Sequence, residues 1–520
     1  MKNRIISLVA LVAILVPAAS SCNPDRLELS NPSALVSSNA YTTEEDINSA
    51  LTGVFHCFYN GFFSNTGFFL LSGQTDELYS QSPDSGLVNF VNFKYPDYDR
   101  NFNLNSYRLL YQLVFRCNQV LTFMEDIEFS KYDKTLIQAQ VRNMRGMAYY
   151  YLAMLWQKVP YVDWVSSPQD QPEESTFDFL CSKVEEDLLF AYDKLPAKFN
   201  DYRPNKWFAA SYLGKLYMNW NGQYAKALTY YQAIVNSKQF DLVPNYRDNF
   251  METTENNVES IFEIQNEANA ATGGWFGRDN NGATCARSSF RQKCTTMSPA
   301  GFGDYSVYQW LIDAYKEEKN KDGGYDIRLR DNIFYEGIFE DFPGEVLWTD
   351  TYSWNTASWQ HLAYIRKYTY DYDRSIKAVN FYNGINTRLL RYGECLLSYA
   401  ECLAKTNNLD EAVKQVNKVR NRANMPDLAN STNARIRESV TSVDKFMAQL
   451  DLERAKECCF EYDRFMDLRR WGLGTDAAFT AKVKARAQKY ADNFTDGKQW
   501  LPIPRSEVDN NPNLTQNTGF

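Results

Sequence analysis

Histidine is nearly absent from this sequence of 520 residues, which holds only His56 and His361. This scarcity excludes most zinc sites with histidine ligands and most Ser–His or Cys–His nucleophile systems. Runs of basic residues are absent as well, and the formal net charge is −9. Nucleic-acid phosphates require clustered Lys and Arg, so an acidic chain of this kind does not suit nucleic acid. We therefore expect no nucleic-acid partner, no metal ion and no cofactor.

Long apolar runs are also scarce, and the clearest one lies near the start, at residues 5–16. It is too short to span a bilayer, which needs about 20 apolar residues. Basic residues precede this run, and the small residues 18–21 follow it, directly before Cys22. This order of basic, apolar and small residues is typical of a secretory signal peptide. We expect residues 1–21 to be removed on export.

Cys22 follows small residues, as the acylated cysteine of a bacterial lipobox does, although Ala19 stands where leucine is commonest. The alternative is an ordinary secreted protein with a free cysteine near its end. Acyl chains contribute ~0.8 kcal/mol per buried CH₂, so several chains hold a protein firmly on a membrane. We predict that Cys22 is a lipid anchor.

The other cysteines form no CxxC pair. Cys395 and Cys402 lie two turns apart on a predicted helix, about 10 Å, which is too far for a disulfide. Adjacent Cys458 and Cys459 are interpreted as small core residues. A bridge between residues 285 and 294 is left open.

Helical periodicity dominates the sequence, and Thr43 with Asp46 or Glu45 offers capping chemistry for its first helix. The pattern predicts helices at residues 43–60, 104–127, 134–156, 177–194, 206–219, 224–237, 387–405, 409–422 and 443–470. Two segments, 206–237 and 387–422, resemble tetratricopeptide helix pairs, in which small residues allow close packing. We expect a mainly α fold with tetratricopeptide-like helical pairs and minor β structure.

Between the helical stretches, Gly, Asn, Ser, Asp and aromatic residues replace the periodic pattern. Long loops inside a compact domain usually carry function. We therefore expect one domain, residues 22–520, that combines a scaffold with a loop-rich insert. The scaffold covers about residues 30–60, 104–240 and 387–520, and the insert covers about residues 61–103 and 265–386.

Aromatic residues make up 15% of the chain, and several occur in the predicted insert. Aromatic faces stack on the apolar faces of sugar rings, while amide and guanidinium groups bond sugar hydroxyls. The candidate ligand-binding residues are Tyr95, Tyr98, Trp275, Arg278, Trp348, Trp354, Asn355 and Trp359, with Asn280 and Asn281 as further polar groups. The alternative for each ring is that it fixes its own loop to the scaffold.

The last third of the chain carries an ordered set of motifs. They are Glu453-Arg454, Glu457, Phe460-Glu461, Arg464, Asp467-Leu468, Arg470-Trp471-Gly472, Leu501-Pro502-Ile503-Pro504 and Asn511-Pro512-Asn513-Leu514. Their order resembles that of SusD/RagB-type lipoproteins. Earlier stretches match too, among them Arg388, Arg391-Tyr392 and Tyr399-Ala400-Glu401. The resemblance thus covers essentially the whole chain after Cys22; it departs from the family at Cys458-Cys459 and at Tyr462-Asp463.

This resemblance implies an outer-membrane lipoprotein that faces the medium. It implies an oligosaccharide or similar nutrient as the ligand, and a SusC-like, TonB-dependent transporter barrel as the partner that the protein covers. It implies no catalysis. Two other interpretations remain: a secreted glycoside hydrolase, and a repeat scaffold that binds proteins or peptides.

Two groups of acidic residues could be structural or functional. Glu457, Glu461 and Arg464 lie at helical spacings, which favours a packed ion-pair network over paired catalytic carboxylates. Residues 322–326 hold two aspartates and two glycines, but they lack the alternating ligands of an EF-hand calcium loop. We expect a solvated turn there.

Overall fold

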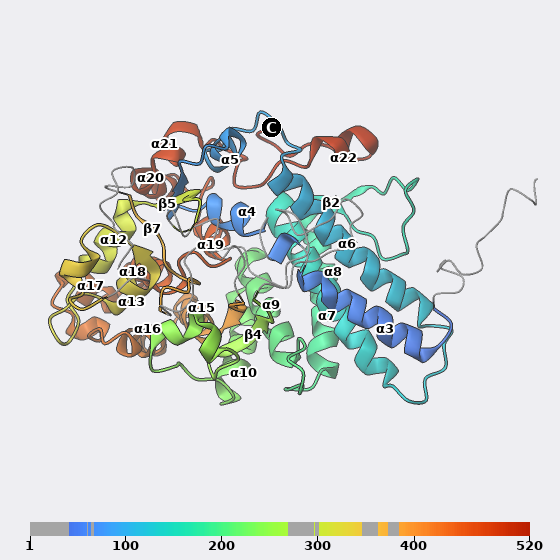
Figure 1. The fold of residues 1–520 in the computed structure, drawn as a ribbon, viewed down its shortest axis with the longest axis horizontal. Helices are drawn as coiled ribbons and strands as arrows, with labels where there is room; N and C mark the ends of the chain where they lie inside the picture. Colours follow the sequence, from blue (N-terminus) through green and yellow to red (C-terminus); the bar gives the residue numbers. More distant parts are fainter. Residues whose placement is uncertain are drawn as a thin grey trace, which may run out of the picture.

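The computed structural model describes residues 41–59, 61–63, 67–268, 296, 301–345, 362–372 and 384–520. The fold is mainly helical with minor β structure, as predicted (Figure 1). The helices of residues 44–55 and 101–194 gather at one end of the molecule, and those of residues 309–332 and 434–458 gather at the other. No helix among the described residues has both the length and the apolar character needed to cross a bilayer.

Helices of the first half lie close to their predicted positions. They are α3 (Glu44–Phe55), η2 (His56–Tyr59), α6 (Asn101–Phe123), α7 (Lys134–Trp156), α8 (Phe177–Lys194), α9 (Lys206–Asn219) and α10 (Tyr224–Asn236). The predicted cap of α3 is a reciprocal capping box. Thr43 Oγ1 accepts a hydrogen bond from Asp46 N at 3.2 Å, and Asp46 Oδ2 accepts one from Thr43 N at 2.9 Å. Two orphan amides of the first turn are satisfied in this way.

Successive helices pack against one another from α6 to α10, and α10 packs against α15 (Tyr392–Lys405), which packs against α16 (Leu409–Arg422). The pairs α9/α10 and α15/α16 are the two segments predicted to be tetratricopeptide-like. Gly214 shows why a small residue is needed at the crossing of α9 and α10. A Cβ atom there would lie 2.6 Å from the ring of Tyr231. The predicted fold class is confirmed.

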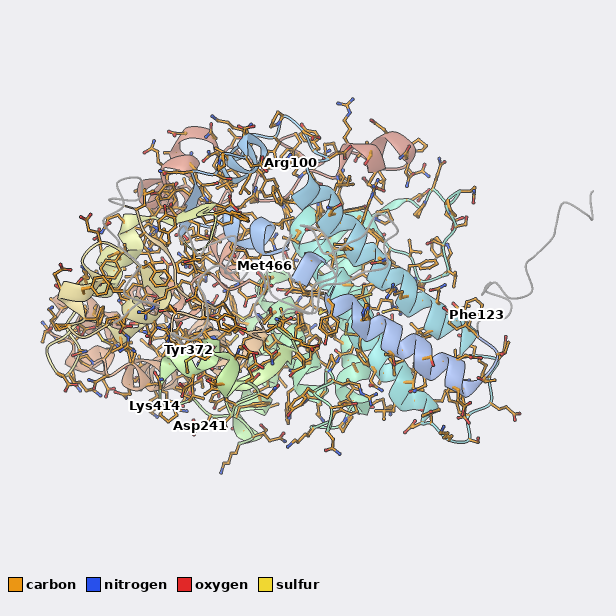
Figure 2. The ribbon with its side chains drawn as sticks, in the orientation of Figure 1. Arg100, Phe123, Asp241, Tyr372, Lys414 and Met466 are labelled. Atoms are coloured by element: carbon orange, nitrogen blue, oxygen red, sulfur yellow. The ribbon has the colours of Figure 1, made fainter. Side chains whose placement is uncertain are left out.

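Buried side chains from these helices pack into one hydrophobic core, and Figure 2 draws the side chains as sticks. Met466, labelled near the middle of the molecule, is buried, and Tyr150 donates a hydrogen bond to its Sδ at 3.2 Å. At the end of α6, Phe123 stacks on Tyr41, with ring centroids 4.6 Å apart. The described cysteines are free and buried, Cys395, Cys402, Cys458 and Cys459 among them, as predicted.

The second half adds short elements after α16. These are η6 (Leu428–Asn430), α17 (Ala434–Glu438), η7 (Ser439–Thr441), α18 (Val443–Cys458), α19 (Arg464–Arg470), α20 (Ala477–Arg486), α21 (Gln488–Asn493) and α22 (Arg505–Asn510). The single helix predicted over residues 443–470 is wrong. Helix α18 ends at Cys458, and Phe460 holds a positive φ of 62°, which a continuous helix cannot contain.

The predicted helix start at residue 387 is also wrong, because residues 387–391 form strand β8 (Thr387–Arg391). This strand pairs antiparallel with β4 (Ser260–Ile264), and all five of its residues are buried. Arg391 of β8 binds Glu457 at 2.6 Å and Glu461 at 2.9 Å. Glu457 and Glu461 therefore belong to a packed ion-pair network, as predicted, but their shared arginine comes from a distant strand. The predicted third member, Arg464, instead binds Asp76 and Asp451, each at 2.8 Å.

The two segments predicted to be loop-rich contain short regular elements where they are described. In residues 61–103 these are α4 (Gly67–Gly73), β1 (Leu78–Ser80) and α5 (Ser85–Val91). In residues 265–386 they are β5 (Tyr305–Val307), α12 (Gln309–Lys316), α13 (Ile327–Asn332), β6 (Ile333–Phe334), α14 (Ile338–Asp341) and β7 (Tyr364–Ile365). The antiparallel pairs β1–β5 and β6–β7 join parts of these segments.

Four further small elements complete the described fold. Strands β2 (Val159–Pro160) and β3 (Glu174–Ser175) pair with each other, and η4 (Tyr246–Phe250) and η5 (Glu252–Thr254) precede β4. Residues 320–326 form a turn in which Asn320 Oδ1 accepts hydrogen bonds from Asp322 N at 3.0 Å and Gly324 N at 2.9 Å. Asp326 then caps α13. The turn predicted for residues 322–326 is confirmed.

Candidate functional site

Most of the predicted ligand-binding residues lie outside the described part of the chain. These are Trp275, Arg278, Trp348, Trp354, Asn355 and Trp359, together with the predicted anchor Cys22 and the pair Cys285 and Cys294. Their roles stay predictions.

Tyr95 and Tyr98 are described, and both contact the C-terminal residue Phe520. The ring centroids lie 5.0 Å from Phe520 for Tyr95 and 5.8 Å for Tyr98, in edge-to-face arrangements. The Tyr95 hydroxyl also accepts a hydrogen bond from the Gln74 amide, and burial raises the Tyr95 pKa above its usual range. The structure thus brings these two tyrosines together at the chain terminus, and their predicted role in ligand binding stays a prediction.

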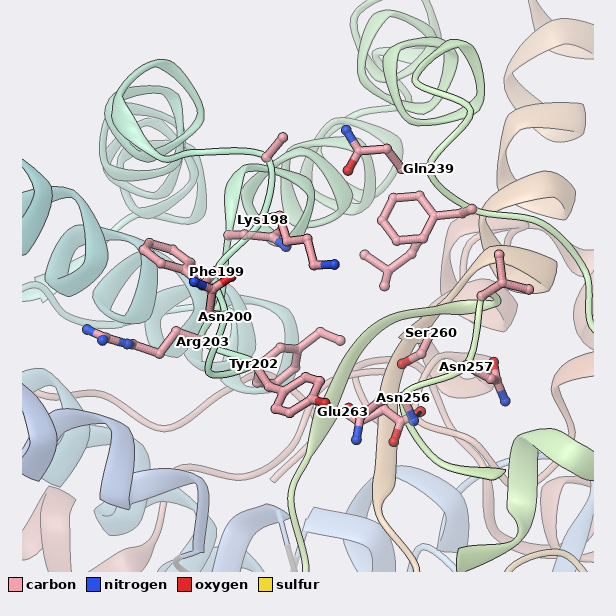
Figure 3. A pocket seen from close by; sticks show the side chains of 16 residues that line it. Lys198, Phe199, Asn200, Tyr202, Arg203, Gln239, Asn256, Asn257, Ser260 and Glu263 are labelled. Carbon is pink, nitrogen blue, oxygen red and sulfur yellow. Dashed lines mark hydrogen bonds between the residues drawn. The ribbon is translucent and has the colours of Figure 1, made fainter. Parts of the chain in front are cut away.

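A cleft lies between the α8–α9 connection and residues 256–265 (Figure 3). Two adjoining hollows form it, with volumes of about 450 Å³ and about 370 Å³. Both hollows are lined by Tyr202, Arg203, Phe262 and Glu263, so we name it the Tyr202 cleft. Sites for small ligands usually have volumes of about 300–1,000 Å³.

The first wall of the cleft is the α8–α9 connection, in which Tyr202 has an unusual backbone. Its φ is +59°, a left-handed value that costs a bulky residue about 1–3 kcal/mol, and the residue is 57% exposed. Arg203 fixes the neighbouring backbone, since it binds Asp201 at 2.6 Å and Gln140 of α7 at 3.2 Å. Its guanidinium also lies over the ring of Phe199. Strained residues that the surroundings hold in place often mark ligand sites.

The second wall begins at Asn256, whose φ is also positive at +53°. Asn256 and Gln265 exchange two amide hydrogen bonds of 2.9 Å each, and Asn256 N donates to Glu263 Oε1 at 3.0 Å. Asparagine adopts this left-handed conformation more readily than tyrosine does. The reciprocal bonds fix the turn that leads into β4.

Strand β8 holds this wall from behind through two buried arginines. Arg388 Nε lies 3.2 Å from Glu263 Oε1, and Arg391 Nη1 donates to Glu259 Oε1 at 3.0 Å. Arg422 of α16 binds the other oxygen of Glu259 at 3.0 Å. Glu263 is only 3% exposed, and its carboxylate already binds Arg388. It is therefore not available as a catalytic group.

One carboxyl beside this wall has a perturbed acidity. Burial raises the pKa of Glu255 to about 7, while a 2.6 Å hydrogen bond from Asn386 N opposes the shift. The charges of Glu263 and Glu252 act in the same direction as burial.

The Tyr202 cleft therefore offers an exposed aromatic ring together with side-chain amides, a hydroxyl and a lysine. The polar residues that line its larger hollow include Lys198, Asn200, Gln239, Asn256, Asn257 and Ser260. Such a mixture suits sugars, which need an apolar platform and hydrogen-bonding groups. No cluster of His, Cys, Asp and Glu in the described residues has the form of a metal site.

Sequence reasoning missed this cleft. Most of its lining comes from residues 197–205 and 256–265, which lie far apart along the chain. A local signal was present, because a tyrosine stands among the turn-forming residues Asn200, Asp201, Pro204 and Asn205. Nothing in that stretch indicates which segment faces it.

Comparison with known proteins gives the family. The model of the SusD family matches residues 258–520, and a model described as starch-binding and associating with the outer membrane matches residues 25–218. A SusD-like protein of Bacteroides ovatus is 25% identical over 99% of this chain and 98% of its own length.

Two solved structures share the fold. A SusD superfamily protein of Bacteroides vulgatus has a TM-score of 0.77 at 24% identity, covering 92% of this chain and all of its own. The surface glycan-binding protein A of Bacteroides thetaiotaomicron, in complex with laminarihexaose, has a TM-score of 0.72 at 23% identity, covering 92% of this chain and 100% of its own. The predicted resemblance is thus confirmed, and this chain belongs to the SusD family.

Proposed function

We propose that this protein is a lipoprotein on the cell surface that binds an oligosaccharide and delivers it to a TonB-dependent outer-membrane transporter. The observation that carries the proposal is the match of the SusD family model to residues 258–520. It is supported by a relative that shares the fold and is named for glycan binding. The transporter would be a SusC-like barrel that this protein covers.

The arrangement at the membrane rests on Cys22. Acylation of Cys22 would hold the protein beside the barrel in the outer membrane, on the outer face. Residues 23–40 would then connect the anchor to α3, whose capping box begins the described fold.

The oligosaccharide would be bound by the predicted aromatic residues, which the described scaffold carries. Ile264 and Gln265 line the smaller hollow of the Tyr202 cleft, and the described chain continues from them to Ala268. Trp275 and Arg278 follow in sequence. Trp348, Trp354, Asn355 and Trp359 complete the predicted set of ligand-binding groups.

Binding without bond cleavage is part of the proposal. Glycoside hydrolysis needs two carboxyl groups about 5–9.5 Å apart across the scissile bond. Glu263 is held by Arg388, and Asp201 is held by Arg203. Neither carboxylate at the cleft is therefore free to act on a sugar.

Two experiments test the proposal. Cys22→Ala should move the protein from the membrane fraction to the soluble fraction, and the parent protein should co-purify with a barrel that the variant loses. An affinity gel with a panel of glycans tests ligand binding, and Trp275→Ala combined with Trp354→Ala should weaken it. Retained binding by that double variant would favour a scaffold for proteins or peptides.

A further inference from the structure

Several polar groups of the Tyr202 cleft have no partner within the described part of the chain. They are the Lys198 ammonium, the Asn200 amide and the Ser260 hydroxyl, for which no hydrogen bond is found there. Gln239 is half used, because its Oε1 accepts a 3.0 Å hydrogen bond from Trp207 Nε1 and leaves the amide nitrogen free to donate. Most of the unused hydrogen-bonding groups are donors, which suits a ligand rich in acceptors.

Charge in the cleft is also unbalanced. Arg203 is neutralised by Asp201 at 2.6 Å, and Glu263 is neutralised by Arg388 at 3.2 Å. Lys198 lines the same hollow and forms no ion pair with any described residue. One positive charge is therefore left uncompensated in the larger hollow, although the protein as a whole is acidic.

The Tyr202 ring adds the third component. The residue is 57% exposed, and no hydrogen bond or ring contact to another described residue holds its side chain. Its strained backbone is nevertheless fixed by the bonds of the adjacent Arg203. An exposed tyrosine ring on a fixed backbone binds a flat apolar surface at little cost in conformational entropy, because only two side-chain torsions have to be fixed.

From these three observations we infer that the Tyr202 cleft binds an acidic oligosaccharide, with a sugar ring on Tyr202 and an anionic group at Lys198. The anionic group is a carboxylate, as in a uronic acid, or a sulfate ester. The inference rests on the proposed oligosaccharide-binding function and adds to it the chemical class of the sugar.

Isothermal titration calorimetry on the chain lacking residues 1–22 tests this inference, since that truncation removes no described element. The probes are hexagalacturonate, a sulfated hexasaccharide and the neutral laminarihexaose. We expect Lys198→Met to lower the affinity for the preferred acidic probe about tenfold, because it removes a charge-assisted hydrogen bond. Lys198→Arg should retain most of the affinity, and laminarihexaose should be insensitive to either change.

Tyr202 is tested with two variants. Tyr202→Ala should lower the affinity for the acidic probe up to about tenfold through the loss of stacking. Tyr202→Gly should do the same while relieving the positive φ, so a loss of affinity in this variant does not arise from unfolding. Matched controls are Phe339→Ala, an exposed ring on α14, and Lys414→Met, an exposed lysine on α16.

The outcomes separate the inference from the function on which it rests. Unchanged affinity for both acidic probes in Lys198→Met and Tyr202→Gly overturns the inference and leaves the proposed function standing. Binding of laminarihexaose alone by the parent overturns the inference and supports the function. A parent that binds no oligosaccharide contradicts both.

Discussion

Arg391 Nη1 donates a hydrogen bond to Glu259 Oε1 at 3.0 Å, and both residues are fully buried. The same nitrogen reaches Glu457 Oε1 at 2.6 Å. The wall of the Tyr202 cleft is thereby joined to α18 through one guanidinium. Arg422 binds Glu259 as well, at 3.0 Å, so the anchor is a network rather than a single pair.

Removing Arg391 should therefore destabilise the whole domain. Arg391→Met leaves Glu259, Glu457 and Glu461 with fewer partners in a buried site, and uncompensated buried charge costs about 3–5 kcal/mol. Urea unfolding followed by circular dichroism measures the effect. Arg505→Met is the matched control, because Arg505 is exposed and its pair with Asp509 contributes under about 1 kcal/mol. Equal effects of the two substitutions would refute the structural role of the network.

The positive φ of Tyr202 should lower the free energy of unfolding of the protein. Glycine adopts a positive φ without steric penalty, so Tyr202→Gly should raise the free energy of unfolding by about 1 kcal/mol. Tyr202→Val should lower it by about 1 kcal/mol or more, since a β-branched residue suffers most there. The same urea titration measures both. A lower stability of Tyr202→Gly would mean that the ring contributes more to the fold than its exposure indicates.

Packing of the tetratricopeptide-like pair α9/α10 is tested at Gly214. Gly214→Ala places a Cβ atom 2.6 Å from the Tyr231 ring and should destabilise the protein by about 1–3 kcal/mol. Gly53→Ala in α3 is a matched control, because nothing lies within 4 Å of its Cβ position. Alanine favours a helix over glycine by up to about 1 kcal/mol, so the control should be neutral or stabilising. Stabilisation by both changes would contradict the close crossing of the two helices.

Glu255 should make stability depend on pH. Its pKa is raised to about 7 in the folded protein, above the value of about 4.3 in an unfolded chain. Between these values the folded state binds more protons, so the contribution of Glu255 to stability falls as pH rises from about 4 to about 7. Glu255→Gln removes this contribution.

The difference in urea midpoint between the parent and Glu255→Gln isolates the effect of Glu255 from that of the other titrating groups. The variant should gain in urea midpoint relative to the parent between pH 5 and pH 7.5. A difference that is constant across this range would show that Glu255 ionises normally.

Long helices were predictable because their signals are local. Helix α7 has the predicted bounds, since Asp133 caps its start and the turn before Pro160 ends it. Strand β8 was not predictable in the same way. Arg388 and Arg391 resemble exposed residues of a helix, and only distant Glu259, Glu263 and Glu457 make their burial possible.

In the candidate site too, features with a local sequence signal were predictable and features that depend on distant segments were not. The tryptophans of the insert can be found by composition alone, because they interrupt polar stretches. The Tyr202 cleft depends on two segments that meet only in the folded chain. Beside the positive φ of Tyr202, Arg203 binds Gln140 of α7, a tertiary contact that no local pattern specifies.

Whether this protein binds oligosaccharides without cleaving them is tested by calorimetric titration of the chain lacking residues 1–22 with a panel of oligosaccharides, with a parallel assay for new reducing ends. We expect saturable binding of at least one oligosaccharide and no new reducing ends on prolonged incubation. Steady release of reducing ends that is lost on changing a single acidic residue, such as Glu255→Gln, would contradict it.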